Sequence, residues 1–316
     1  MSITYDSQKI NSLDSTIISD KEFNVSICQD NKKINDISPS SVCDIIESEQ
    51  INYIDKTKIL NVVGDVMVYT INGLYKICDL IDKEVEIWSG SRWFRVFIYK
   101  STQISSQTNI QKITICNGAC LKCTNNQNWA IIDKNKIISV QTNNLEINMR
   151  IPTYKLPDIL TGYIVKNTYD IGKQIGKLFI SKQQFTSNKH IQLPNQIYKL
   201  CPHSLGRFVA GWMDSQNGNI YGNYLVIHDL QLLLHRLHIY ISYIVKKNMY
   251  YMLEIPNTTN IPNPNNKIRK SNLNIKKNRI YIDSIETIPL VQKIYSIQNL
   301  DPKTKTIVLD GVLAII

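Results

Sequence analysis

The sequence lacks any apolar run that approaches the roughly 20 residues of a membrane span, and its polar beginning lacks the apolar core of a signal peptide. We therefore expect an intracellular, non-secreted protein without a membrane partner. The chain has 316 residues, of which 43% are hydrophobic. This length is enough for two or three modules that each bury a core.

Histidine is scarce and unevenly placed. All five histidines lie between His190 and His238. Residues 1–189 and 239–316 therefore contain no imidazole that could act as a general acid or base. His235 and His238 share one expected helix, but no quartet of metal-ligating residues surrounds them in the sequence. We expect no metal site there.

The seven cysteines are an odd number, so they cannot all pair within the chain, and we expect reduced thiols. Cys116, Cys120 and Cys123 have no fourth zinc ligand near them. Asn117-Gly118 between them is typical of a tight hairpin turn. We interpret the three residues as strand cysteines rather than as a zinc site.

Positive charge is concentrated in one part of the chain. The formal net charge is +10, and residues 156–280 contain 16 Lys+Arg against 5 Asp+Glu. A basic block of this kind favours a polyanionic partner, namely DNA or RNA. The alternative is that the Asn/Lys/Ile-rich composition reflects an AT-rich genome and that the charge is a solvated surface.

Residues 1–58 are rich in Ser, Asp and Asn, with an apolar patch at residues 42–46, and we expect a partly ordered extension with one short helix. From Leu60 onward, short apolar runs alternate with turn residues, which predicts an all-β module. The expected strands are residues 66–70, 74–80, 85–88, 93–99, 113–116, 119–123, 129–132 and 137–141. The β pattern returns at residues 279–288, 294–300 and 306–313.

Between these two β stretches the pattern is helical. We expect helices at residues 170–180 and 204–214, and a third that Asp229 caps and that ends near Leu237. A hairpin follows, with strands at residues 239–245 and 249–255 and a turn at Lys246-Lys247-Asn248. Residues 256–277 form a Pro/Asn/Lys-rich connector. The order predicts an α+β module inserted into the all-β module.

The segment from Phe208 to Gly218 resembles the LAGLIDADG (dodecapeptide) motif of metal-dependent endonucleases. Adjacent small residues, Ala210 and Gly211, would let a second helix approach closely, Asp214 stands at the first acidic position and Gly218 closes the motif. The second acid, the usual Mg²⁺ ligand of that family, is replaced by Gln216 or Asn217, and one residue is inserted. Neutral amides bind hard divalent cations poorly.

The flanking β stretches resemble the Hint (hedgehog/intein) fold. The resemblance rests on four blocks in the family's order: residues 64–80, 117–124, 294–297 and 308–313. It covers roughly residues 60–316 and implies four parts: a 1–58 extension, a 59–155 N-terminal Hint-like half, a 156–280 LAGLIDADG-like insert and a 281–316 C-terminal Hint-like half. The implied fold class is an all-β Hint module split by an α+β module.

The resemblance also locates the residues that protein splicing would use. Asn61 stands where the family has the first nucleophile, which must be Cys, Ser or Thr. Thr124 is retained from the Thr-x-x-His box, but Gln127 replaces the imidazole. The chain ends Ala314-Ile315-Ile316, so Ile315 and Ile316 stand where the family has its terminal His-Asn pair. We expect no splicing.

The LAGLIDADG-like insert also lacks residues that its family needs for catalysis. Residues 169–176 resemble the remains of a first motif helix, but Lys177-Leu178 stands where acids would follow. We expect no catalytic residue, no metal site and no cofactor, with Mg²⁺ needed only if the endonuclease is active. The resembled enzymes lay strands along DNA, which makes Lys246, Lys247, Tyr250 and Tyr251 the candidate nucleic-acid contacts.

Three functions from different classes follow from this reading. The favoured hypothesis is an intein-derived protein that has lost splicing and cleavage and is retained as a structural or binding protein, with protein partners or self-assembly. Its composition is compatible with a large DNA virus, and therefore with a virion role. The second hypothesis is an active homing endonuclease that uses Asp214. The third is a non-catalytic nucleic-acid-binding module.

Overall fold

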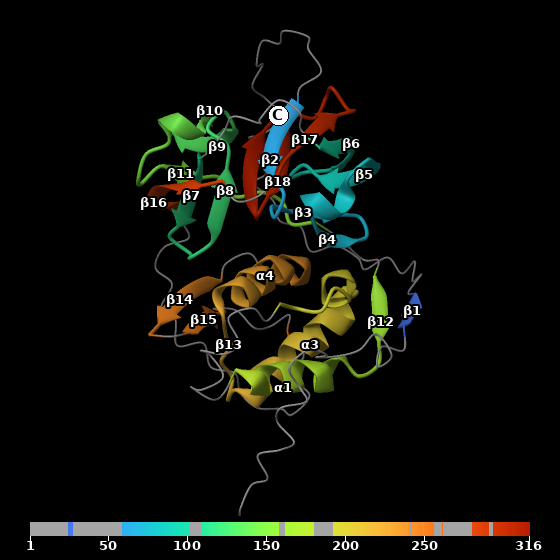
Figure 1. Ribbon diagram of the computed structural model, residues 1–316. Helices are drawn as coiled ribbons and strands as arrows, with labels where there is room; N and C mark the ends of the chain where they lie inside the picture. Colours follow the sequence, from blue (N-terminus) through green and yellow to red (C-terminus); the bar gives the residue numbers. More distant parts are fainter. Residues whose placement is uncertain are drawn as a thin grey trace, which may run out of the picture.

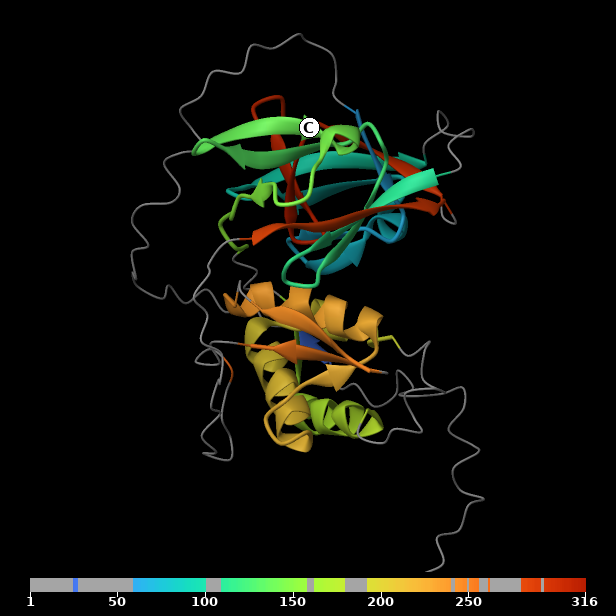
Figure 2. The ribbon, with the colours of Figure 1, turned by 90° about the vertical axis from the view of Figure 1, so that its left-hand side faces the viewer.

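A computed structural model describes residues 25–27, 59–100, 109–157, 162–179, 192–239, 242–248, 250–255, 261, 280–290 and 293–316. The elements form two bodies, one above the other (Figures 1 and 2). The upper one, called the strand body, is a fourteen-stranded sheet. The lower one, called the helical body, comprises the elements between residues 162 and 255. Within the described ranges, no helix has the length and apolar character that crossing a membrane requires.

The strand body is made by two separate stretches of chain. Its elements are β2 (Ile59–Val63), β3 (Met67–Thr70), β4 (Gly73–Lys76), β5 (Lys83–Trp88), β6 (Trp93–Lys100), β7 (Asn109–Ile115), β8 (Cys120–Cys123), β9 (Asn128–Asp133), β10 (Lys136–Gln141), β11 (Arg150–Ile151), β16 (Ile280–Pro289), β17 (Ile294–Asn299), β18 (Thr306–Leu309) and β19 (Val312–Ile315). The late strands interleave with the early ones: β17 lies between β2 and β6, and β16 lies between β11 and β7. Neither stretch could complete this sheet alone.

Alternating side chains explain why these segments are strands. In β6, Phe94, Val96 and Ile98 are buried while Arg95 is exposed, as expected when successive residues point to opposite faces. Their hydrophobic side chains join a core formed entirely within the strand body. The turn at Gly118 has a φ of +82°, which glycine adopts without strain.

The helical body combines three helices with short strands. Its elements are β12 (Tyr163–Val165), α1 (Thr168–Leu178), α3 (Pro202–Ser215), β13 (Tyr221–Gly222), α4 (Tyr224–Leu234), β14 (Tyr243–Lys247) and β15 (Tyr250–Glu254). Strands β13, β15 and β14 form a three-stranded sheet, and β1 (Val25–Ile27) pairs with β12. The described 3-10 helices of the chain are η4 (Ile77–Leu80), η5 (Thr142–Asn144), η6 (Ile197–Lys199) and η7 (His235–Leu237).

Helices α1 and α3 cross at glycines. A Cβ at Gly172 would overlap the Phe208 carbonyl, and one at Gly211 would overlap the Tyr169 carbonyl. The two backbones are therefore in direct contact, which a larger residue would prevent. This is the close approach that the small residues of the sequence predict.

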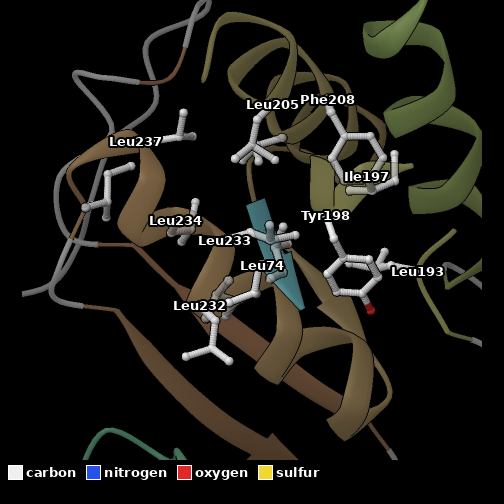
Figure 3. Packing of buried hydrophobic residues seen from close by; sticks show 14 of the residues in the cluster. Leu74, Leu193, Ile197, Tyr198, Leu205, Phe208, Leu232, Leu233, Leu234 and Leu237 are labelled. Atoms are coloured by element: carbon white, nitrogen blue, oxygen red, sulfur yellow. The ribbon is translucent and has the colours of Figure 1, made fainter. Parts of the chain in front are cut away.

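A second core joins the two bodies. It contains Leu205 and Phe208 of α3 and leucines of α4, together with Tyr69 and Leu74 from the strand body. Figure 3 shows Leu74, on the cyan strand β4, among the leucines of α4. The helical body therefore packs against the sheet through buried apolar side chains.

Two strand predictions are corrected by the structure. Residues 74–80 are not one strand, because β4 ends at Lys76 and η4 follows. Ile77 and Leu80 are both buried, and a 3-10 turn places residues three apart on one face, whereas a strand would not. Residues 306–313 form a hairpin: Asp310 and Gly311 have φ values of 47° and 75°, as a type I′ turn requires.

Two predictions in the helical body are also wrong. Asp229 lies inside α4, and the cap is Asn223, whose side chain accepts a hydrogen bond from Val226 N–H at 2.9 Å. Lys246 and Lys247 are the last residues of β14 rather than a turn. The turn includes Asn248, whose φ of 47° is tolerated by asparagine.

Some predictions fall beyond the described residues. Helix α1 ends at Leu178. Residue 180, the extension 1–58 apart from residues 25–27, and the connector 256–277 apart from Ile261 are not described. The division of the chain after residues 58, 155 and 280 stays a prediction.

Candidate functional site

The first candidate site lies where β2 pairs with β8 and β17. Val62 pairs with Cys123, which places Asn61 beside Thr124. Thr124 Oγ1 donates a hydrogen bond to the Asn61 carbonyl oxygen at 3.3 Å, and Ser296 Oγ donates to Asn61 Oδ1 at 2.7 Å. A carboxamide held in this way is a structural polar group, and it offers no nucleophile.

Gln127 is buried in the next turn of chain. The residue is 2% exposed. Its backbone carbonyl oxygen accepts hydrogen bonds from Thr142 N–H at 2.8 Å and from Thr142 Oγ1 at 3.0 Å. Trp129 Nε1 donates to the same hydroxyl at 3.1 Å. Within the described ranges, Gln127 Oε1 has no hydrogen-bond partner. The side chain cannot exchange a proton near neutral pH, so it provides no general acid or base.

The end of β19 reaches the same part of the sheet. Ile315 pairs with Asn128, the residue after Gln127, and Ile316 N–H donates to the Lys305 carbonyl at 2.9 Å. Figures 1 and 2 both show the C-terminus close to the start of β2. The residues that the sequence assigned to splicing are thus gathered at one end of the sheet.

Sequence reasoning missed two parts of this site. Ser296 lies opposite Asn61 because β17 pairs with β2, and no signal in the sequence gives that register. Thr142 and Trp129 fill the space beside Gln127, and their hydrogen bond likewise depends on how the turns fold together.

The second candidate site is the end of helix α3. Tyr169 Oη donates to Asp214 Oδ2 at 2.9 Å. Gln216 is 5% exposed; its Nε2 donates to the Gly176 carbonyl at 2.7 Å, and its Oε1 accepts from Tyr221 N–H. Both ends of this carboxamide are occupied by backbone groups, so Gln216 links α1, α3 and β13.

The residues after Gln216 close the helix. Asn217 has a φ of 56°, and Gly218 N–H donates to the Met213 carbonyl at 2.7 Å, the arrangement of a Schellman cap. No group of three His, Cys, Asp or Glu side chains in the described residues could hold a metal ion. Asp214, the one acid of the motif, accepts its hydrogen bond from the Tyr169 hydroxyl.

The third candidate site is the β14–β15 hairpin. Lys246 pairs with Tyr251 and Lys247 with Tyr250, and both lysines are exposed. The Tyr250 ring meets Tyr221 edge-on at a centroid distance of 5.1 Å. The lysine ammonium groups are accessible to a phosphate, whereas this tyrosine ring is already packed.

Tyr251 is packed in the same way, because its ring meets Tyr224 of α4 edge-on at 5.2 Å. Cross-strand partners share a face, so Lys246 and Tyr251 project to one side of the sheet and Lys247 and Tyr250 to the other. The four candidate contacts therefore do not form one surface.

His228 lies in α4, and His235 and His238 follow that helix. His235 and His238 do not share a helix, because α4 ends at Leu234 and His238 has a φ of 57°. His235 Nδ1 lies 2.7 Å from Tyr69 Oη and 3.2 Å from Tyr154 Oη. Burial lowers the pKa of His228 to about 4, so this ring is neutral at neutral pH.

No protein-family model matches the sequence, and a comparison with curated proteins gives no match. Among solved structures the chain is similar to inteins. A variant of the Ssp DnaB mini-intein is 9% identical, with 83% of this chain and 96% of that chain covered and a TM-score of 0.35. The Pab PolII intein is 7% identical, with 80% and 98% covered and a TM-score of 0.36.

A third similar structure is the DnaX mini intein from Spirulina platensis, which is 10% identical, with 81% and 99% covered and a TM-score of 0.32. The fold of this chain is rich in sheet, with a few helices. The TM-scores are low, so the functional proposal rests on the residues of this chain.

Proposed function

We propose that this chain derives from an intein that carried a LAGLIDADG-type insert, that it neither splices nor cuts DNA, and that it is retained as a structural or binding protein. One observation carries the proposal: carboxamides stand at the two positions where the chemistry needs a titratable group. Gln127 replaces an imidazole and Gln216 replaces a carboxylate, and both are buried.

The contacts around Asn61 support the proposal that the chain does not splice. An acyl shift needs a hydroxyl or thiol on the residue that attacks its own preceding carbonyl, and Asn61 has neither. Its Oδ1 is held by Ser296. Ile315 and Ile316 at the other end of the reaction have no side-chain amide that could cyclise. Each loss alone removes transition-state stabilisation on the order of several kcal/mol.

The pair of helices α1 and α3 supports the proposal of a LAGLIDADG-type insert that does not cut DNA. Close packing of α1 on α3 through Gly172 and Gly211 is the arrangement expected of two motif helices. At the end of α3, however, the acid Asp214 is followed by the amides Gln216 and Asn217. A single Asp214 would leave Mg²⁺ with most of its water and with little effect on a leaving oxygen.

Incubation of the full chain with dithiothreitol or hydroxylamine tests the proposal. We expect one species of unchanged mass after prolonged incubation, because no ester or thioester can form at Asn61. Intact-mass spectrometry is the measurement. A thiol-induced fragment of about 60 residues would show that the acyl shift still operates.

A second candidate is a nucleic-acid-binding module. The observation that favours it is the exposed pair Lys246 and Lys247 at the tip of the β14–β15 hairpin, within a block that has 16 Lys+Arg against 5 Asp+Glu. Phosphate contacts of this kind give affinity without sequence preference. The composition is also compatible with a large DNA virus, so a virion role belongs to the proposal.

A further inference from the structure

Helix α4 and the 3-10 turn η7 dock on the strand body at the β18–β19 turn. A Cβ added at Gly311 would lie 3.0 Å from Leu232 Cδ2 and 3.2 Å from His235 Cε1. Asp310 and Gln231 line a cavity of about 20 Å³ at this contact. A space of that size admits about one water molecule, so docking leaves the Asp310 carboxyl almost without hydration.

A negative charge on Asp310 would be poorly compensated. The residue is 7% exposed, and its Oδ1 accepts one hydrogen bond, from Met67 N–H at 2.8 Å. Burial is the main reason that the pKa of Asp310 lies well above its ordinary value; the hydrogen bond from Met67 N–H opposes it, and the carboxylates of Asp65 and Asp229 raise the pKa further. Lys122 opposes them, but it is already paired with Asp65.

The titratable groups that face Asp310 come from each element packed against it. They are Asp65 after β2, Lys122 and Cys123 of β8, Tyr224 and Asp229 of α4, and His235 of η7. Lys122 is the one lysine or arginine in this set, and it is paired with Asp65. A charge on Asp310 therefore has no unpaired cation of this set beside it.

We propose that docking of α4 and η7 on the strand body is linked to the proton on Asp310, so that the two bodies hold together strongly while this carboxyl is neutral and open more readily as the proton leaves. In the opened state water surrounds the carboxyl, and the charged form is stable there. In the docked state the same charge would face other carboxylates across a nearly dry contact. A rise in pH therefore favours opening.

Two other buried groups act at lower pH and in opposite directions. Burial lowers the pKa of His228 to about 4, so its contribution to docking is lost as the pH falls below about 6.5. Burial raises the pKa of Asp229 to about 6, so its contribution is lost as the pH rises from about 4 to 6. Comparison of the wild type with a variant that lacks the Asp310 carboxyl separates the contribution of Asp310 from these two.

Hydrogen–deuterium exchange of the full chain tests the proposal, with the amides of residues 224–237 as the readout. After correction for intrinsic exchange, we expect their protection to fall with rising pH, by up to about tenfold per pH unit where Asp310 loses its proton. Amides of β5 and β6 should show no such slope. In Asp310→Asn, whose amide oxygen can still accept from Met67 N–H, the part of the slope that Asp310 contributes should be absent.

Asp133→Asn is the matched control, since this acid is exposed at the end of β9, and it should keep the wild-type slope. Constant protection in the wild type, an unchanged slope in Asp310→Asn, or an equal slope in β5 and β6 would each overturn the proposal. If Asp310→Asn does not fold, carboxyl ¹³C NMR of the wild type decides. An Asp310 resonance that titrates above the ordinary range of an aspartate supports the proposal, and titration within that range overturns it.

Discussion

The carboxamide of Gln216 links α1, α3 and β13. Replacing it with the acid of the resembled motif tests how much these hydrogen bonds contribute to stability. Gln216→Glu places a carboxylate oxygen against the Gly176 carbonyl, which needs a donor. We expect a loss of about 1–3 kcal/mol in the free energy of unfolding, measured by urea denaturation.

The neighbouring Asn217 is exposed, so Asn217→Asp is the control and should change stability by no more than about 0.5 kcal/mol. Equal losses in the two variants would show that the contacts of Gln216 contribute nothing specific.

For single residues, the sequence predicts which motif positions are substituted, but it does not predict the hydrogen bonds that the new side chains make. Asn61, Gln127 and Gln216 could be located because each occupies a fixed place in a motif. The bond from Ser296 to Asn61 joins residues 235 positions apart, and the bonds of Gln216 depend on α1 lying against α3. Such contacts follow from tertiary packing, which a local pattern does not encode.

The crossing of α1 and α3 is the element most sensitive to a single methyl group. Gly172→Ala places a Cβ against the Phe208 carbonyl, so the helices must separate. We expect a loss of about 3 kcal/mol or more in the free energy of unfolding, measured by chemical denaturation. Gln174→Ala, at an exposed position of the same helix, should stay within about 0.5 kcal/mol of the wild type. A tolerated Gly172→Ala would contradict the backbone contact.

Elements bounded by strong local signals were predictable. The hairpins at Asn117-Gly118 and at residues 89–92 follow from turn residues between alternating runs, and α1 and α3 follow from their apolar periodicity. The start of α4 was misplaced because its first turn carries few cues apart from Asn223. The β18–β19 hairpin was taken for one strand, although Asp310-Gly311 is a turn signal.

Charge distribution is a property of the whole molecule, and it predicts DNA affinity that depends on salt. We expect weak, sequence-tolerant binding whose logarithm falls with the logarithm of salt concentration, by a slope of about one per phosphate contact. Replacing Lys246 and Lys247 with Gln should lower the affinity and flatten the slope. Fluorescence anisotropy over a salt series measures both quantities.

Lys83 and Lys134 are exposed lysines of the strand body, and replacing both with Gln is the matched control. Salt-independent binding, or none at low ionic strength, would favour a solvated surface. Supercoiled DNA in the same samples should stay intact in Mg²⁺ or Mn²⁺. Metal-dependent nicking that Asp214→Asn abolishes would instead establish an active endonuclease.

The interleaving of β16 to β19 among the earlier strands also determines the order in which the molecule can be completed during translation. The ribosome releases residues 59–151 first, yet β2 and β6 cannot pair with β17 until residues 294–299 emerge. The helical body is contiguous from residue 162 to 255, so it is complete earlier, by about 3–12 s at typical elongation rates for roughly 60 residues. During that interval it can cover Leu74 and Tyr69, and so shield one face of an unfinished sheet from other nascent chains.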